Sequence, residues 1–111
     1  QEVIGEETSE DIEAIATLNR AAFGGEQEVA IIDRLRRDGQ VALSLVEREA
    51  GAVVGHILFS DLDVMVDGRA ARAVALAPMA VEPARQRTGI GSRLVRTGLG
   101  ILKDRGYEAV I

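Results

Sequence analysis

The residues best suited to chemistry form a short turn late in the chain, Gln86-Arg87-Thr88-Gly89-Ile90-Gly91. The apolar run 70–81 before it predicts a buried strand that Pro83 ends, because proline cannot donate to a sheet ladder. From Ile90 onward the pattern is helical. The first amides of a helix lack partners and carry partial positive charge, and glycines let a phosphate approach the backbone. This strand, turn and helix therefore predict a phosphate-binding site.

Charge and helical phase support the same site. Residues 83–106 hold six basic side chains and one acid, a net charge of +5 in a chain whose net charge is −5. On a helical wheel at about 100° per residue, Gly91 and Gly98 lie near the middle of the apolar half. Glycine costs about 1 kcal/mol in a helix interior. Two glycines on the apolar face therefore predict a helix that lies very close to a sheet.

The turn and the strand before it resemble the GNAT superfamily of acetyl-CoA-dependent N-acetyltransferases, whose signature is Gln/Arg-x-x-Gly-x-Gly/Ala. The resemblance implies that backbone amides of the turn hold the pyrophosphate of coenzyme A. It also implies that the end of the strand pairs with the pantetheine arm like an added β-strand. The cofactor-binding residues that it implies are Met79, Ala80, Val81, Gln86, Arg87, Thr88, Gly89, Ile90, Gly91 and Ser92.

Other interpretations of the turn stay open. Two glycines can simply connect a strand to a helix. A dinucleotide-binding fold shares the strand–turn–helix arrangement, but its third glycine would stand where this chain has Leu94. Arg87 lies inside the turn and is the arginine best suited to a phosphate. Arg85, Arg93 and Arg96 either attract phosphates or are solvated helix charges.

The order of elements predicts one α/β domain over residues 1–111, a mixed sheet with helices on both faces. The expected elements are strand 3–7, helices 12–23 and 26–37, strands 41–46, 52–60 and 70–81, helix 90–105 and strand 107–111. This order, β-α-α-β-β-β-α-β, is similar to the GNAT fold. Because that family normally continues with a helix and two strands, the resemblance implies a domain truncated at the C-terminus, with an unprotected apolar edge.

Local signals set several boundaries. Thr8-Ser9-Glu10-Asp11 has capping-box spacing, with Thr8 or Ser9 as the cap. Gly39 stands where a glycine commonly ends a helix. Residues 49–51 read as a turn, and Asp67-Gly68 is a hairpin signal.

Composition restricts the class of protein. With 47% hydrophobic and 28% charged residues, the chain has the composition of a soluble globular domain. The absence of cysteine excludes disulfides and thiolate chemistry, and the His, Asp and Glu residues show no metal-ligand spacing. The acidic balance and the scarcity of aromatic residues argue against nucleic acid, and no apolar run reaches the length of a membrane span. We expect a cytoplasmic protein without a metal, and the resemblance to the GNAT superfamily implies a bacterial-type member.

The resemblance implies direct transfer of an acetyl group from acetyl-CoA to a primary amine. The amide of Ala80 or Val81 would polarise the thioester carbonyl. In histone-type relatives a glutamate acts as base at the position of Ala75, and alanine cannot accept a proton. The remaining candidates are His56, the only histidine, and Glu82. Each has a structural alternative, a satisfied sheet position for His56 and a rim position for Glu82.

Other functions remain open beside this enzyme. A non-catalytic acyl-CoA-binding or sensing module would keep the turn without catalytic groups. An interaction domain would instead form a homodimer through its open edge. The loop 23–25 is where many relatives admit the acceptor, although it can equally be a plain helix connection. The acceptor amine itself is a small metabolite, an antibiotic, a peptide terminus or a protein lysine.

Overall fold

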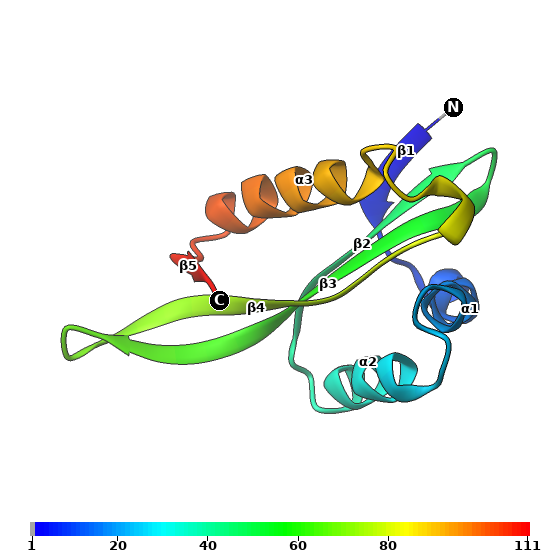
Figure 1. Ribbon diagram of the computed structural model, residues 1–111. Helices are drawn as coiled ribbons and strands as arrows, with labels where there is room; N and C mark the ends of the chain where they lie inside the picture. Colours follow the sequence, from blue (N-terminus) through cyan, green and yellow to red (C-terminus); the bar gives the residue numbers. More distant parts are fainter. Residues whose placement is uncertain (1) are drawn as a thin grey trace.

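The computed structural model describes residues 2–111, in which a mixed five-stranded sheet has helices on both faces (Figure 1). The strands are β1 (Glu2–Glu6), β2 (Val41–Glu49), β3 (Ala52–Val66), β4 (Arg69–Val81) and β5 (Ala109–Val110). The helices are α1 (Ile12–Phe23), α2 (Gln27–Arg37) and α3 (Ile90–Asp104), with 3-10 turns at Ser9–Asp11 and Pro83–Arg85. Strand order follows the chain, and only β4 and β5 are parallel. No helix within residues 2–111 is long and apolar enough to cross a membrane.

The main difference from the expected elements is the length of β3. It was expected over 52–60 but continues to Val66, paired with β4 as far as Arg69. In this outer part Asp61 and Asp63 alternate with apolar residues, which suits a projecting two-stranded arm that water reaches. The strand expected over 107–111 is also shorter, because only Ala109–Val110 pairs as a strand.

Turns and caps agree with the local signals. Both hairpin turns, Ala50–Gly51 and Asp67–Gly68, have positive φ at their two central residues, as the twist of paired strands requires. The Thr8 amide donates to the Asp11 carboxylate over 2.8 Å, so Thr8 is the capping residue. Gly39 follows α2 with φ +66°, in the left-handed conformation expected of a helix-ending glycine.

Side chains of the sheet alternate between two cores. Because successive strand residues point to opposite faces, Leu45 packs under α3 while Val46 packs under α1 and α2. The core under α3 contains Leu43, Leu45, Val54, Ile57, Phe59, Val74, Ile90, Leu94 and Leu102. The core on the other face contains Ile15, Ile32, Val46 and Leu58.

Two glycines allow α3 to lie close to the sheet. A Cβ atom at Gly98 would stand 2.4 Å from Cε2 of Phe59, and one at Gly55 would stand 2.6 Å from Cγ2 of Ile90. Phe59 and Ile90 are both buried and cannot move aside. The close approach expected from Gly98 is therefore confirmed. Gly91 is less tightly packed, since its Cβ would meet the Met79 methyl at 3.3 Å.

This packing reverses the usual effect of an alanine in a helix. Gly98→Ala is expected to lower the free energy of unfolding by about 1–3 kcal/mol, because it overpacks a rigid core. Gly100→Ala, on the same helix with open space around its Cβ, is expected to raise it by up to about 1 kcal/mol. Urea unfolding measures both changes. Stabilisation by both substitutions would contradict the close contact with Phe59.

Candidate functional site

The connection from β4 into α3 presents a row of unused backbone donors. Arg87 and Gly89 have φ values of +68° and +92°, which turn the chain sharply before α3. The Arg93 amide makes the first helical hydrogen bond, to the Gly89 carbonyl over 3.0 Å. Within residues 2–111, the amides of residues 87–92 donate no backbone hydrogen bond. Consecutive free amides at a helix N-terminus form an anion-binding site.

The strand that leads into this loop has an open edge. β5 pairs with β4 only at Ala73 and Val74, and the last such bond joins the Leu76 amide to Ile111. An extra residue at Ala77–Pro78 then shifts the register against β3. Because the Glu82 amide bonds to β3, alternation turns the amide and carbonyl of Ala80 toward β3 and those of Met79 and Val81 outward.

Most residues expected to bind the cofactor meet along this edge and loop. Met79 and Val81 border the open side of β4, and the Gln86 side-chain amide donates to the Val81 carbonyl over 3.3 Å. The Thr88 hydroxyl donates to the Arg85 carbonyl over 2.5 Å. The side chains of Ala80 and Ile90 are buried, that of Ile90 in the core under α3, so these residues face the loop only through their backbones.

The charge of the loop is lower than the sequence suggests. Arg93 makes a two-point ion pair with Glu47, and Arg85 makes another with Glu49. These two glutamates of β2 offset the charge of two arginines that were candidates for phosphate binding. Arg87 and Arg96 are exposed and have no ion-pair partner among residues 2–111.

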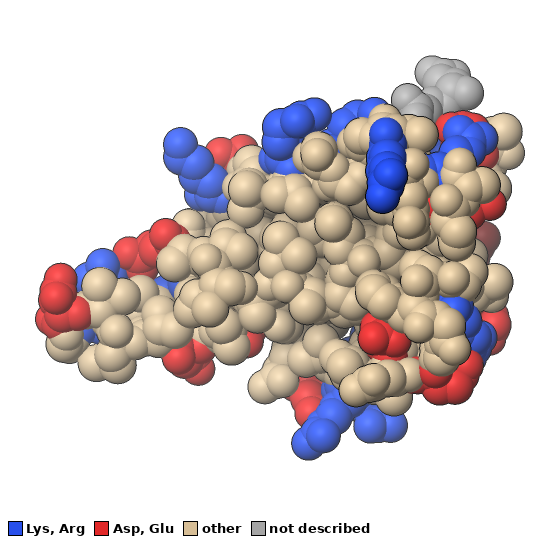
Figure 2. Space-filling model, viewed as in Figure 1, with Lys and Arg blue, Asp and Glu red and all other residues tan. Residues whose placement is uncertain are grey.

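Surface charge is nevertheless divided between parts of the fold. Figure 2 shows Lys and Arg side chains gathered over α3, while the projecting end of the β3–β4 hairpin carries both acidic and basic side chains. The charged residues of this outer hairpin are Asp61, Asp63, Asp67, Arg69 and Arg72. The basic face therefore lies on the side of the sheet that carries the loop. This distribution favours the approach of an anion to α3 over the rest of an acidic chain.

His56 lies in the interior between α1 and the sheet. Its Nε2 is 2.9 Å from the Ser44 hydroxyl, which donates its own hydrogen to Glu7 over 2.5 Å, so Nε2–H donates to Ser44. Asn19 approaches Nδ1 at 3.5 Å. Burial lowers the pKa of His56 to about 4, although the nearby Glu7 carboxylate opposes this shift. The imidazole has no exposed surface.

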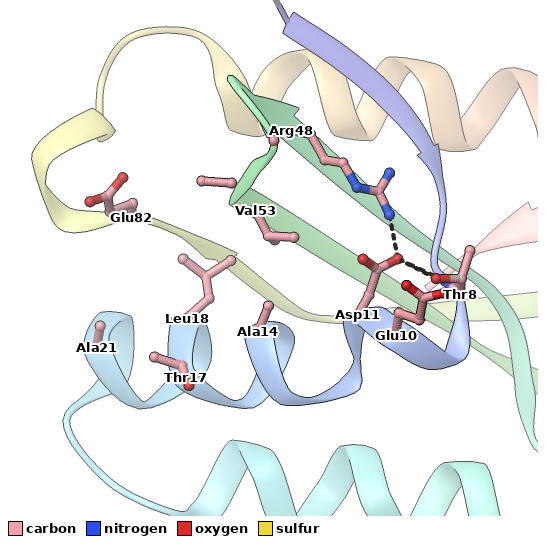
Figure 3. A pocket seen from close by; sticks show the side chains of 12 residues that line it. Thr8, Glu10, Asp11, Ala14, Thr17, Leu18, Ala21, Arg48, Val53 and Glu82 are labelled. Carbon is pink, nitrogen blue, oxygen red and sulfur yellow. Dashed lines mark hydrogen bonds and ion pairs between the residues drawn. The ribbon is translucent and has the colours of Figure 1, made fainter.

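Glu82 lines a large cavity that no residue of the loop 86–92 borders. This cavity has a volume of about 880 Å³ and lies between α1 and the β2–β3 turn (Figure 3). Its wall is made largely of small and apolar residues such as Ala14 and Leu18, and the Asp11–Arg48 ion pair borders it. The open edge of β4 does not line it. The structure therefore separates the two candidate bases, since His56 is no part of its wall.

A smaller cavity adjoins the open edge and contains a carboxylate that the sequence analysis missed. It measures about 320 Å³ and is lined by Phe23, Glu28, Ile31, Ala77, Pro78 and Met79. Glu28 is half-buried, and no residue in the described part of the chain forms a hydrogen bond or ion pair with it. The only sequence signal was the neighbouring loop 23–25. Glu28 itself sits in an ordinary amphipathic helix that its charge does not distinguish.

Sequence comparison identifies a family of similar proteins. The profile of the family described as "Acetyltransferase (GNAT) domain" matches residues 4–111. The chain is 35% identical over 102 residues to the uncharacterized N-acetyltransferase YhbS of Escherichia coli strain K12. That alignment covers 91% of this chain and 60% of YhbS, so the chain spans less than two thirds of this relative.

Two solved structures share the fold. A GNAT family acetyltransferase from Brucella melitensis in complex with acetyl-CoA has a TM-score of 0.89 at 36% identity, over 99% of this chain and 73% of that one. YhbS from Escherichia coli in complex with CoA has a TM-score of 0.90 at 34% identity, over 99% and 61%. These likenesses confirm the α/β fold expected from the sequence.

Acidification is expected to destabilise the fold through His56. Its pKa of about 4 lies below the ordinary histidine value of 6.5, so the unfolded chain binds the proton more readily. The free energy of unfolding therefore falls as the pH drops from about 6.5 toward 4, by up to about 3 kcal/mol. Urea unfolding at stepped pH values measures this change.

His56→Gln supplies the control, because the chain has no other histidine. Hydrogen bonds and nearby arginines lower the pKa values of Glu7 and Asp11 from 4.5 and 3.8 despite partial burial, so the stability that these carboxylates contribute is lost as the pH falls below those values. The variant should show little pH dependence between pH 6.5 and 4.5. An imidazole NMR titration with its midpoint near 6.5 would contradict the prediction.

Proposed function

The chain belongs to the GNAT acetyltransferase domain family, and we propose that it binds acetyl-CoA and transfers the acetyl group directly to a primary amine. The observation that carries this proposal is that the open edge of β4 leads straight into a loop of free amides. The coenzyme complexes of the Brucella melitensis protein and of YhbS support it.

In this proposal the amides of residues 87–92 hold the pyrophosphate. Arg87 adds a cation beside them, since it is exposed and lies within the turn. The pantetheine arm pairs with the outward amide and carbonyl groups of Met79 and Val81, as an extended peptide adds to a sheet edge. Ala80 supports the strand from its buried position rather than through its side chain.

The reaction then needs no covalent intermediate on the protein. The amine nitrogen attacks the thioester carbonyl carbon, a C–N bond forms and the C–S bond breaks. The amine loses one proton, and the coenzyme A thiolate gains one. Negative charge develops on the carbonyl oxygen in the transition state, and an N–H group aimed at it lowers the barrier. The outward amides of Val81 and Met79 are our candidates for this donor.

We assign the acceptor amine to the cavity beside Met79. Glu28 is the carboxylate suited to an ammonium there, because it has no competing partner among the described residues. Phe23, Ile31 and Pro78 give the cavity apolar walls. These walls favour a primary amine that carries an apolar substituent. Glu28 can hold the cation and accept its proton before attack.

His56 and Glu82 remain predictions as bases. His56 is neutral at pH 7 and able to accept a proton, but it is wholly buried. Glu82 lines the larger cavity, which the open edge of β4 does not border. Ala75, opposite Ser60, leaves the position of the histone-type glutamate without a base.

A non-catalytic acyl-CoA-binding or sensing module is the second candidate, and Ala75 is the observation that favours it. Such a module would use the same loop and edge without turning over an amine. Cytoplasmic residence is part of the proposal and agrees with the lack of a membrane-spanning helix within residues 2–111. Pairing of two copies through the β5 side, where Val110 is exposed, is a further proposal.

Substitutions in the loop test the coenzyme site. Gly89→Asp and Gly91→Asp should each abolish binding of acetyl-CoA and coenzyme A, because they put a side chain and a negative charge against the pyrophosphate. Calorimetric titration measures the affinity, with NADH as a comparison ligand. Gly100→Asp, on the exposed side of the same helix, should bind normally. Retained affinity in both loop variants would exclude the proposed site.

Substitution of Glu28 tests the acceptor site. Glu28→Gln should lower kcat/KM for the amine by about 100-fold or more, since it removes the proton acceptor. The KM for acetyl-CoA should stay unchanged. Thiol release over a panel of primary amines with apolar substituents measures both. Glu13→Gln, an exposed position on α1, is the control, and equal rates in the two variants would exclude a role for Glu28.

A further inference from the structure

We propose that Glu47 and Glu49 of β2 are positioning residues for the coenzyme site. Through Arg93 and Arg85 they hold the two ends of loop 86–92 in the shape that its free amides require. This inference rests on the proposed function, because it assigns the loop to the pyrophosphate of coenzyme A. Neither glutamate was a candidate at the sequence level.

The inner contact joins β2 to the first turn of α3. Arg93 donates from Nε to Oε1 of Glu47 over 3.2 Å and from Nη2 to Oε2 over 2.8 Å. The Glu47 side chain is fully buried, whereas that of Arg93 is 33% exposed. Two parallel bonds fix the direction of the guanidinium as well as its distance. Arg93 Nη1 also lies 3.4 Å from the place where a Cβ at Gly89 would stand.

The outer contact holds the other end of the loop. Arg85, at the end of the 3-10 turn, donates from Nη1 to Oε2 of Glu49 over 2.5 Å and from Nη2 to Oε1. The side chains are 41% and 22% exposed. Because Glu47 and Glu49 are two residues apart on one strand, they point to the same face. The free amides of residues 87–92 lie between the two anchored arginines in sequence.

Gly55 makes this geometry accessible. It pairs with Glu47 across the sheet and leaves room for Ile90, whose Cγ2 would otherwise be 2.6 Å from a Cβ. Leu94 occupies the same space. With both residues packed into this gap, Arg93 between them is brought over Glu47. The ion pair and the apolar contact therefore fix the same turn of α3.

Electrostatics explain why both members of each pair are needed. A buried carboxylate without a cation would repel a diphosphate bound above it, and it would carry a desolvation penalty. Arg93 offsets the charge of Glu47 and leaves anion binding to the amides and Arg87. An arginine without its glutamate would keep its charge but lose its position. Loss of a glutamate should therefore weaken the binding of the pyrophosphate, which contacts the loop, and leave the binding of the rest of coenzyme A unchanged.

The experiment compares coenzyme A with pantetheine, which lacks the pyrophosphate and the nucleotide. Each ligand is titrated into the protein, and binding is followed by the chemical shifts of the protein's backbone amides. This measurement detects both tight and weak binding. Glu47→Gln and Glu49→Gln should weaken coenzyme A at least about 10-fold and leave pantetheine within about twofold. Should Glu47→Gln fail to fold, the more exposed Glu49→Gln carries the test alone.

Glu7→Gln is the matched control. It breaks a two-point ion pair between Glu7, which directly follows β1, and Arg36 of α2, with both side chains 20% exposed. It should change neither affinity. Exchange of the outer partners, Glu49→Arg with Arg85→Glu, should restore coenzyme A binding relative to Glu49→Gln. If Glu49→Gln merely destabilised the fold, the exchanged pair would not restore the affinity for coenzyme A while leaving the affinity for pantetheine unchanged.

Failure of the positioning role and failure of the proposed function give different results in this experiment. If the unaltered chain binds no coenzyme A, the proposed function fails and the positioning role falls with it. If it binds normally but neither glutamate variant weakens coenzyme A, only the positioning role is overturned. Equal losses for coenzyme A and pantetheine, or failure of the exchanged pair to recover, would also overturn it.

Discussion

The close packing of α3 on the sheet is the constraint on which the rest of the structure depends. At Gly98 and Gly55 the protein has no room for a single methyl group, and the contacting side chains are buried. Protein interiors packed to this density have low compressibility, so the helix and the sheet cannot easily shift relative to each other. Because the helix cannot move away, its N-terminal amides stay beside the end of β4. The open edge of β4 and the free amides before α3 are thereby kept next to each other.

The same packing decides how charge is distributed at the loop. With the first turn of α3 pressed onto β2, Glu47 is buried and needs a cation, which Arg93 supplies from the helix. The positive charge of the basic segment 83–106 is thus partly offset by glutamates of β2. In the proposed site, the backbone N–H dipoles of the loop therefore make most of the contacts to an anion. These dipoles add no net charge to the loop. This arrangement suits the proposed function, in which an acidic protein holds a diphosphate.

The sequence predicted features that local patterns determine. The turn at Gly89 and Gly91, the close contact at Gly98 and both hairpin turns follow from glycine placement and periodicity. The loop ion pairs could not be predicted, since their partners stand 46 and 36 residues apart and only folding brings them together. Glu28 was missed for the same reason. The outer part of β3 was missed because a solvated arm lacks the continuous apolar run of a buried strand.

The extra residue at Ala77–Pro78 changes which backbone groups of β4 face its open edge. Before it, Val74 and Leu76 direct their backbone groups to β5. Without the insertion, Pro78 and Ala80 would face outward next, and proline has no amide to donate. The inserted residue shifts the register by one, so Met79 and Val81 face outward instead. The open edge therefore presents the amide and carbonyl of Met79 and the amide of Val81, while the Val81 carbonyl accepts from the Gln86 side chain. Ala80 at the same time keeps its bonds to β3, so the strand remains anchored while its other side is free.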